Sequence, residues 1–228
     1  MITFEHVRHA TCRVTIGEQV LLIDPMLSEV GALPPVGFAT NQRRNPLMEL
    51  PVPVDEVLAG VDAVIVTHTH FDHFDDAARR LIPAATPILC RTSDAARLRS
   101  WGFEDVRAGE GGRLDFDGVR LRFDDGPHAW GALRALAGTS ASVRVEHGDQ
   151  SILFSGDRRL DRGILDLLAA RPTRFVVNAG SARFRLGRPI TWTSAQVRRV
   201  AQQHPEIEID VVHLDAINHC VESGATTR

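Results

Sequence analysis

Three histidines fall within six positions of the chain, at His68, His70 and His73, and Asp72 lies between the last two. Neutral imidazole and carboxylate groups are the ligands that zinc and similar divalent ions accept. His68 and His70 are two residues apart, so an extended backbone directs both side chains to the same side. Three neighbouring imidazoles would repel one another once protonated, which makes a solvated loop without metal a poor alternative. The run therefore predicts a metal site.

The segments on either side of this run indicate how it is positioned. An apolar segment at 61–67 predicts a buried strand that ends at the run. After the run, residues 75–81 are typical of a helix, with acids in the first turn and arginines in the last. The C-terminal end of a buried strand is where an α/β protein usually places its site.

The rest of the chain alternates segments typical of strands and of helices. We expect hairpins at 12–16 with 20–23 and at 113–123. Further strands are expected at 87–90, 141–146, 151–155, 174–177 and 207–212, and further helices at 54–59, 93–99, 161–169 and 193–203. Thr193 is the expected N-cap of the last helix. Strands in both halves with helices between them indicate two packed sheets with helices outside, in one domain over residues 1–228.

The composition excludes several classes of chemistry. The sequence contains no lysine and no tyrosine, so neither a Schiff-base lysine nor a tyrosine acid or nucleophile is available. Arginine is the only side chain with a fixed positive charge that could bind a substrate anion. Cys12, Cys90 and Cys220 are far apart and form no C-x-x-C pair, so neither a disulfide framework nor a cysteine zinc site is indicated.

The charge and the start of the sequence bear on partners and location. The formal net charge of −3 at pH 7 provides no basic surface for nucleic acid. No stretch approaches the length of a membrane span, and the first residues lack the cationic start and apolar region of a signal peptide. We therefore expect a cytoplasmic protein that acts on a small-molecule substrate, with no nucleic-acid or membrane partner. The oligomeric state stays open, and a homo-oligomer is one alternative.

The spacing H-x-H-x-D-H of residues 68–73 resembles the signature of the metallo-β-lactamase superfamily. In that family the signature also follows a hydrophobic strand, and the likeness extends to His9-Ala10-Thr11, to residues 22–25 and to the order of the later strands. The resemblance implies an α+β fold, the αββα sandwich, with two packed mixed β-sheets and helices on the outer faces. It also implies that the metals lie at one edge of the two sheets.

The resemblance further implies two bound divalent ions, with zinc expected and manganese as the alternative. The implied ligands of one ion are His68, His70 and His128, those of the other are Asp72, His73 and His213, and Asp157 lies between the ions. Two positions keep alternatives. His219 is the alternative to His213, because residues 214–217 replace the short glycine-containing stretch that usually follows the last ligand. Asp24 is either an acceptor that orients a ligand imidazole or simply the end of a strand.

By the same resemblance, the reaction is hydrolysis by a metal-bound hydroxide, with Asp72 as the catalytic residue that orients the nucleophile and passes its proton to the leaving group. His9-Ala10, Asp24-Pro25 and residues 178–180 are similar to the ascorbate-phosphate lactonase group, so a lactone or ester-type small molecule is the leading substrate. The alternatives are a phosphodiesterase on the same two-metal site, a metal-binding protein without turnover, and an iron-dependent oxidoreductase.

Substrate contacts are expected from the irregular, proline-rich segment at 27–53, because long loops inside compact domains are usually functional. The candidates for an apolar wall, with core packing as the alternative, are Phe38, Trp130 and Trp192. The candidates for binding an anionic group, with a solvated surface position as the alternative, are Arg43, Arg44, Arg183 and Arg185.

Overall fold

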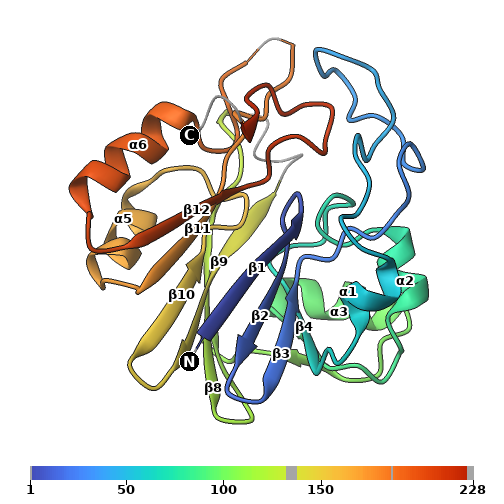
Figure 1. Cartoon of the computed structure of the whole chain (residues 1–228), viewed down its shortest axis with the longest axis vertical. Coiled ribbons are helices and arrows are strands. Elements are labelled where there is room, and N and C mark those ends of the chain that lie inside the picture. Colours follow the sequence, from blue (N-terminus) through green and yellow to red (C-terminus); the bar gives the residue numbers. More distant parts are fainter. Residues whose placement is uncertain (1, 132–137, 186, 225–228) are drawn as a thin grey trace. The chain divides into compact units, whose positions relative to one another are not determined.

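The computed structural model describes residues 2–131, 138–185 and 187–224. Its strands form two six-stranded sheets, each accompanied by helices (Figure 1). The chain divides into two compact units. The first contains residues 1–28, 50–124 and 143–151, and the second contains residues 29–49, 125–142 and 152–228. Each unit has a hydrophobic cluster of its own. A single domain over residues 1–228 stays a prediction.

The first sheet belongs to the first unit and is mixed. Its strands, in the order in which they pair, are β1 (Ile2–Arg8), β2 (Thr11–Ile16), β3 (Gln19–Ile23), β4 (Ala63–Val66), β5 (Ile88–Cys90) and β6 (Val106–Ala108). The strands β1, β2 and β3 pair antiparallel, whereas β3, β4, β5 and β6 pair parallel. All four residues of β4 are buried, and its sequence is an unbroken apolar run, as is typical of a strand with parallel neighbours.

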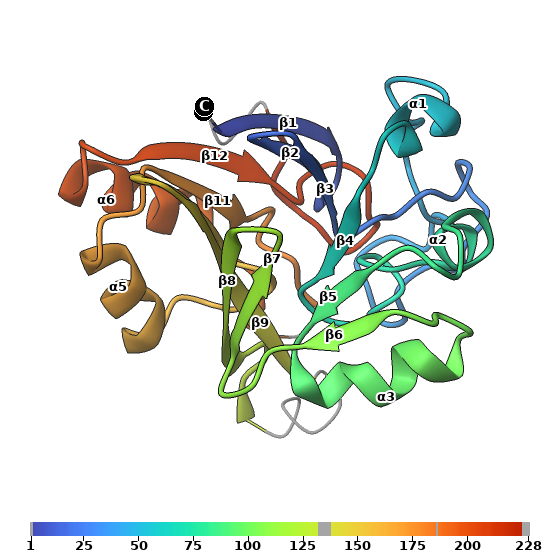
Figure 2. The ribbon, with the colours of Figure 1, turned by 90° about the horizontal axis from the view of Figure 1, so that it is seen from below.

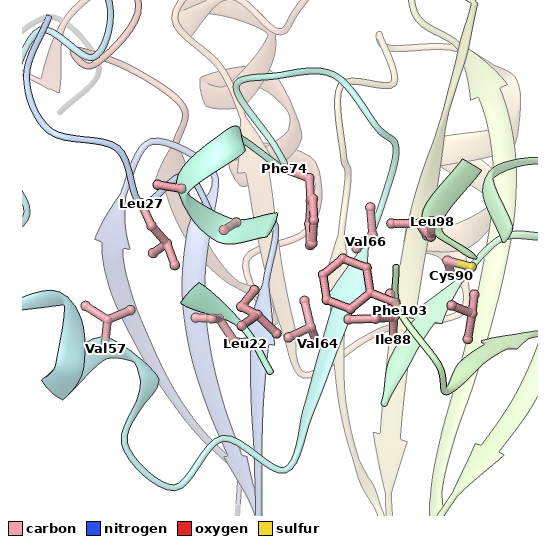
Figure 3. Packing of buried hydrophobic residues seen from close by; sticks show 14 of the residues in the cluster. Leu22, Leu27, Val57, Val64, Val66, Phe74, Ile88, Cys90, Leu98 and Phe103 are labelled. Atoms are coloured by element: carbon pink, nitrogen blue, oxygen red, sulfur yellow. The ribbon is translucent and has the colours of Figure 1, made fainter. Parts of the chain in front are cut away.

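Three helices cover one face of the first sheet, and they are α1 (Val54–Leu58), α2 (Asp76–Leu81) and α3 (Thr92–Ser100) (Figure 2). The core on this face includes Leu22 and Phe74 (Figure 3). Phe74 is fully buried, stacks on Trp101 with ring centroids 5.8 Å apart, and meets Phe103 edge-on at 5.5 Å. Because Phe74 directly follows His73, this packing anchors the histidine run to the core of the first unit.

The second sheet carries the later predicted ligands at the ends of its strands. Its strands, in pairing order, are β7 (Arg113–Phe116), β8 (Val119–Pro127), β9 (Thr139–His147), β10 (Gln150–Phe154), β11 (Arg174–Asn178) and β12 (Glu208–Val212). The strands β7 and β8 pair antiparallel, and β10, β11 and β12 pair parallel. Asp157 follows β10, Asn178 is the last residue of β11, and His213 follows β12. Because the C-terminal ends of parallel strands meet at one edge of a sheet, these three residues lie at the same edge.

The helices of the second unit are α5 (Arg162–Ala169) and α6 (Ser194–Gln203), which pack with Trp192 and Phe175 in one cluster. Trp192 is fully buried, its ring lies 5.6 Å from that of Phe175, and its Nε1 donates to the carbonyl oxygen of Arg158 at 2.8 Å. Trp192 is therefore a core residue and not a wall of a substrate site. Thr193 caps α6 as predicted, in a capping box with Gln196.

Most predicted elements are confirmed with shifts of a few residues at their ends. Two strands were not predicted, β1 because its residues are mostly polar and half-exposed, and β6 because it has only three residues. The described part of the segment 27–53 contains no helix or strand, as predicted, and only an isolated bridge joins Leu33 to Asn45. None of the described helices combines the length and apolar character needed to cross a bilayer.

Candidate metal centre

The histidine run of the first unit folds into a turn that brings its three imidazoles together. The backbone N–H of His73 donates to the carbonyl oxygen of His70 at 3.0 Å, which closes the turn. Nε2 of His68 lies 3.0 Å from Nδ1 of His70, and the His68 and His73 rings are 4.1 Å apart. The three histidines thus converge just beyond the end of β4, as their spacing predicted.

Asp24 decides the orientation of His73. Its Oδ2 accepts from Nδ1 of His73 at 2.7 Å, and its two oxygens also accept from the backbone N–H and the hydroxyl of Thr67 at 2.8 and 2.6 Å. The carboxylate is buried, and the backbone adopts φ 46° to present it. Of the two interpretations left open by the sequence, the structure favours the acceptor that orients an imidazole, because Oδ2 of Asp24 holds Nδ1 of His73.

Asp72 has a neighbour that the sequence did not assign. Nε2 of His9 lies 3.3 Å from Oδ2 of Asp72, and both side chains are buried. His9, Asp72 and His73 each offer one ligand atom within 4.8 Å of the others. His9 follows β1 with φ 56°, a left-handed conformation that a histidine adopts only when surrounding contacts hold it there. The sequence places His9 near the start of a strand, but this position does not predict its contact with Asp72.

Asp75, which follows the run, is structural. Its side chain accepts from the N–H of Ala78 at 2.8 Å and so caps α2, and it also accepts from the N–H of Ser28 at 2.7 Å. Both contacts hold the segment after the histidines in place, and they account for the burial of this carboxylate.

The second unit contains the other three predicted ligands, gathered around Asp157. Nε2 of His213 lies 3.3 Å from Oδ1 of Asp157, and Nε2 of His128 lies 3.6 Å from Oδ2. Nδ1 of His128 donates to the backbone carbonyl of Asp157 at 3.0 Å, which fixes the ring. Asn178 donates from Nδ2 to Oδ1 of Asp157 at 2.9 Å, and it contributes an orienting contact that the sequence did not assign to it.

The turn that presents Asp157 requires a glycine. Gly156 has φ 54°, and a Cβ at this position would lie 2.3 Å from the carbonyl oxygen of Ala141. The N–H of Asp157 donates to Oγ of Ser140 at 3.0 Å, and the hydroxyl of Ser155 donates to the Gly156 carbonyl at 2.7 Å. Ser155 therefore holds the turn and is not placed as a nucleophile.

His213 and not His219 is the histidine that faces Asp157. His213 is fully buried and has φ 64°, and the ring of His219 lies perpendicular to it with centroids 6.3 Å apart. Sγ of Cys220 lies 3.6 Å from Nδ1 of His213 on the other side of the ring. This geometry supports the preferred assignment of His213, with His219 as its neighbour.

The long loop of the second unit is held by a buried asparagine. Asn218 accepts at Oδ1 from the N–H of Val36 at 2.9 Å and from Nδ2 of Asn45 at 3.0 Å, and it donates from Nδ2 to the Asn41 carbonyl at 2.7 Å. Phe38 at the outer part of this loop is 83% exposed, so it is not core. The loop therefore has one anchored conformation although it lacks regular secondary structure.

Of the arginines considered for anion binding, Arg44 is engaged within the loop, where it donates to the carbonyls of Gly31 and Ala32 at 2.6 and 2.8 Å. Arg43, Arg183 and Arg185 are exposed.

Cys90 is buried in the core of the first unit. This burial is the largest influence on its thiol and raises the pKa to about 12. Cys90 is therefore a buried core thiol whose environment disfavours the nucleophilic thiolate.

The donor sets of both clusters fit divalent cations. Two nitrogen ligands of one tetrahedral zinc ion lie roughly 3.3 Å apart, given Zn–N distances of about 2.0–2.1 Å. In the first unit, the ligand atoms of His68 and His70 are 3.0 Å apart, and in the second unit those around Asp157 are 3.3 and 3.6 Å apart. Imidazole and carboxylate atoms are thus presented at the spacing that a shared ion requires.

Comparison with known proteins identifies the family. Residues 19–182 match the model described as the Beta-lactamase superfamily domain. The chain is 34% identical over 219 residues to the UPF0173 protein YddR of Bacillus subtilis, an alignment that covers 93% of this chain and 85% of that protein. The chain belongs to the UPF0173 family of the metallo-β-lactamase superfamily.

Two solved structures are similar over the whole chain. One is a possible metal-dependent hydrolase from Veillonella parvula, with a TM-score of 0.94 and 32% identity, covering 100% of this UPF0173 chain and 91% of that chain. The other is isothiocyanate hydrolase from Delia radicum gut bacteria, with a TM-score of 0.93, 33% identity and coverage of 100% and 90%. The predicted metallo-β-lactamase fold, with two mixed six-stranded sheets and helices, is confirmed, as is its class, a metal-dependent hydrolase.

Proposed function

We propose that this UPF0173 protein binds two divalent ions with the clusters of both units and hydrolyses a small molecule at an electrophilic carbon. The observation that carries the proposal is that the predicted ligands gather within their own units, with His68 and His70 3.0 Å apart, Asp72 and His73 within 4.8 Å of each other, and His213 and His128 3.3 and 3.6 Å from Asp157. The residues that would hold the ions are His68, His70, Asp72 and His73 in the first unit and His128, Asp157 and His213 in the second.

When bound, divalent ions would lower the pKa of a bound water toward about 7 and would polarise the substrate oxygen. Asp72 accepts the proton of the attacking water through one carboxylate oxygen and returns it to the leaving group. His9 positions the carboxylate of Asp72 through the 3.3 Å contact between its Nε2 and Oδ2. Asp24 keeps His73 in the tautomer that carries the proton on Nδ1. Asn178 fixes Asp157 in the same manner in the second unit.

A lactone or ester is the substrate class that the ascorbate-phosphate lactonase-like residues favour. Attack on the carbonyl carbon breaks the C–O bond, and the proton held by Asp72 is transferred to the departing alkoxide. Zinc is the metal we propose, since imidazole and carboxylate donors at these distances suit it. Manganese is the alternative, which reconstitution of the metal-free protein with each ion distinguishes.

A second candidate substrate class is an isothiocyanate, favoured by the isothiocyanate hydrolase that is 33% identical to this chain. The central carbon of this group is also an electrophile open to attack by water. The same residues serve both substrates, because in each case a proton leaves the attacking water and is delivered to a heteroatom bonded to the attacked carbon.

Metal analysis combined with a substrate panel tests the proposal. The protein is loaded with zinc, its metal content is measured, and turnover is assayed on a lactone, an aryl ester, an aromatic isothiocyanate and a phosphodiester. We expect two ions per chain and turnover of a carbon electrophile that His70→Ala abolishes while circular dichroism shows a folded protein. Turnover of the phosphodiester alone would favour the phosphodiesterase. Two bound ions without turnover of any class would favour a binding protein and contradict the proposal.

A further inference from the structure

A cavity of about 150 Å³ lies in the second unit, and nothing in the proposed reaction uses it. The lining residues that matter for its chemistry are Trp130, Arg159, Arg188, Thr193 and Gln196. None of the described residues that line it is acidic. Cavities that bind whole drug-sized ligands measure about 300–1,000 Å³, so this one suits a single chemical group of a ligand.

Two guanidinium groups share one indole ring in this cavity. Cζ of Arg159 lies 3.6 Å from the centroid of the Trp130 ring, and Cζ of Arg188 lies 5.8 Å from it. The indole is fixed because its Nε1 donates to the carbonyl oxygen of Pro189 at 2.9 Å. The ring quadrupole attracts both cations and holds them in the lining of one cavity.

The start of α6 adds hydrogen-bond donors to the same lining. In the capping box, Oγ1 of Thr193 accepts from the N–H of Gln196 at 3.3 Å, and Oε1 of Gln196 accepts from the N–H of Thr193 at 2.9 Å. These contacts use the oxygen atoms of both side chains as acceptors. The hydroxyl hydrogen of Thr193 and the amide hydrogens of Gln196 can therefore serve a ligand. Guanidinium, hydroxyl and amide donors together suit an oxyanion.

Two residues that line the cavity are close in the sequence to proposed ligands of the second unit. Trp130 comes two residues after His128, and Arg159 comes two residues after Asp157, so each pair of Cα atoms lies within about 8 Å. The N–H of Arg159 donates to the carbonyl oxygen of Pro127 at 3.2 Å, which ties the two segments together. The backbone that carries two of the lining residues is thus continuous with the backbone that carries two proposed ligands.

We propose that this cavity is a subsite for the carboxylate or phosphate group of the substrate, so that the enzyme prefers anionic esters to neutral ones. The role as a substrate subsite rests on the proposed function, whereas the binding of an oxyanion does not. Arg159 and Arg188 pair with the anion, Thr193 and Gln196 donate to it, and Trp130 contacts the adjoining apolar part of the molecule.

Binding to the metal-free protein tests the cavity independently of turnover. Benzoate, phenyl phosphate and neutral benzyl alcohol are titrated while tryptophan fluorescence and amide chemical shifts are followed. We expect one of the two anions to bind and benzyl alcohol not to bind, and the stronger anion identifies the natural group. Arg188→Gln, at an exposed position, should weaken binding about tenfold or more, and Arg199→Gln, exposed on α6 outside the lining, should not. Equal binding to the parent and Arg188→Gln proteins would overturn the proposal.

Steady-state kinetics tests the role as a substrate subsite. An aryl ester with a distal carboxylate is compared with its neutral methyl-ester analogue on the zinc-loaded protein. Arg188→Gln should raise KM about tenfold for the anionic ester, with kcat unchanged, and should leave the neutral ester unaffected. An equal change for both esters, or none, would overturn the role as a subsite even if the anions bind.

Discussion

A single carboxylate controls how the first unit presents its histidines. Asp24 receives three hydrogen bonds, from the N–H and hydroxyl of Thr67 and from Nδ1 of His73, and it is buried at the end of β3. An imidazole that donates from Nδ1 is left with Nε2 as its lone-pair nitrogen. The position of one proton in the first unit therefore determines whether His73 can be a ligand.

We predict that Asp24→Asn lowers zinc affinity about tenfold to a hundredfold, because the amide has one acceptor oxygen for three donors. Competition with a chromophoric chelator measures the affinity. Asp55→Asn, at an exposed position of α1, serves as the matched control and should bind zinc as the parent does. An Asp24→Asn protein with unchanged affinity would mean that His73 is not oriented through this contact.

His9 contacts Asp72 from a left-handed backbone conformation. Its φ of 56° places the imidazole against Asp72, and asparagine tolerates this conformation better than most side chains. We predict that His9→Asn retains both ions but lowers kcat at least about tenfold, because Asp72 loses the contact that positions its proton-accepting oxygen. Metal content and kcat are measured on the same preparation. Unchanged kcat with full metal content would exclude this role.

At the scale of elements, the N-terminus of α6 is joined to the C-terminal segment by Glu222. This carboxylate accepts from the N–H and the hydroxyl of Ser194 at 2.8 and 2.7 Å, and the N–H of Glu222 donates to the Gly180 carbonyl at 3.0 Å. Burial raises the pKa of Glu222, but the hydrogen bonds from Ser194 and the charge of Arg198 help to outweigh this effect, so the pKa is lowered from its ordinary value of 4.5. The ionised form thus stabilises the start of the helix.

A group whose pKa is lowered on folding contributes stability above its unfolded pKa and loses it as the pH falls through the folded value. We predict that Glu222→Gln lowers Tm by about 2–4 °C at pH 7, as expected for roughly 1 kcal/mol at a helix N-terminus in a chain of this size. The difference from the parent should shrink as the pH falls below 4.5. Thermal unfolding over a pH series measures it, with Glu29→Gln, at an exposed position, as the control. A difference independent of pH would contradict the role of the charge.

At the scale of the whole molecule, each unit carries residues that we propose as metal ligands. Any ion that binds the folded chain and not the unfolded one stabilises the fold by mass action. The proposed metal centre is thus also a source of stability, because its ligands come from β-strand ends that are distant in the sequence.

We predict that removing zinc with a chelator lowers Tm by about 5–10 °C, which corresponds to about 2.7 kcal/mol at a free zinc concentration a hundredfold above Kd. Differential scanning calorimetry with and without chelator measures the shift. The His70→Ala protein should show a smaller shift in Tm on chelation, because the ion held by His68 and His70 would be bound more weakly. If chelation left Tm unchanged, the clusters would not bind an ion with the affinity that catalysis needs.

Much of the candidate site could be predicted from the sequence, because its characteristic residues are close together in the chain. The run from His68 to His73 combines closely spaced ligand types with an apolar strand before it. Such a pattern can be recognised within a short stretch of sequence. His128, Asp157 and His213 could be assigned through the resemblance, because each follows a strand. The strands β1 and β6 were missed, since a half-exposed polar strand and a three-residue strand leave no periodic pattern.

The sequence by itself determined the ligand types, the strands that carry them and the family to which they point, because residue identity and periodicity are properties of neighbouring positions. Only the tertiary structure decided that His9 contacts Asp72, that Asp24 orients His73, that His213 rather than His219 faces Asp157, and that Trp192 belongs to the core while Trp130 lines a cavity. These relations join residues through left-handed backbone conformations and long-range contacts. Folding selects them through packing, which no short stretch of sequence encodes.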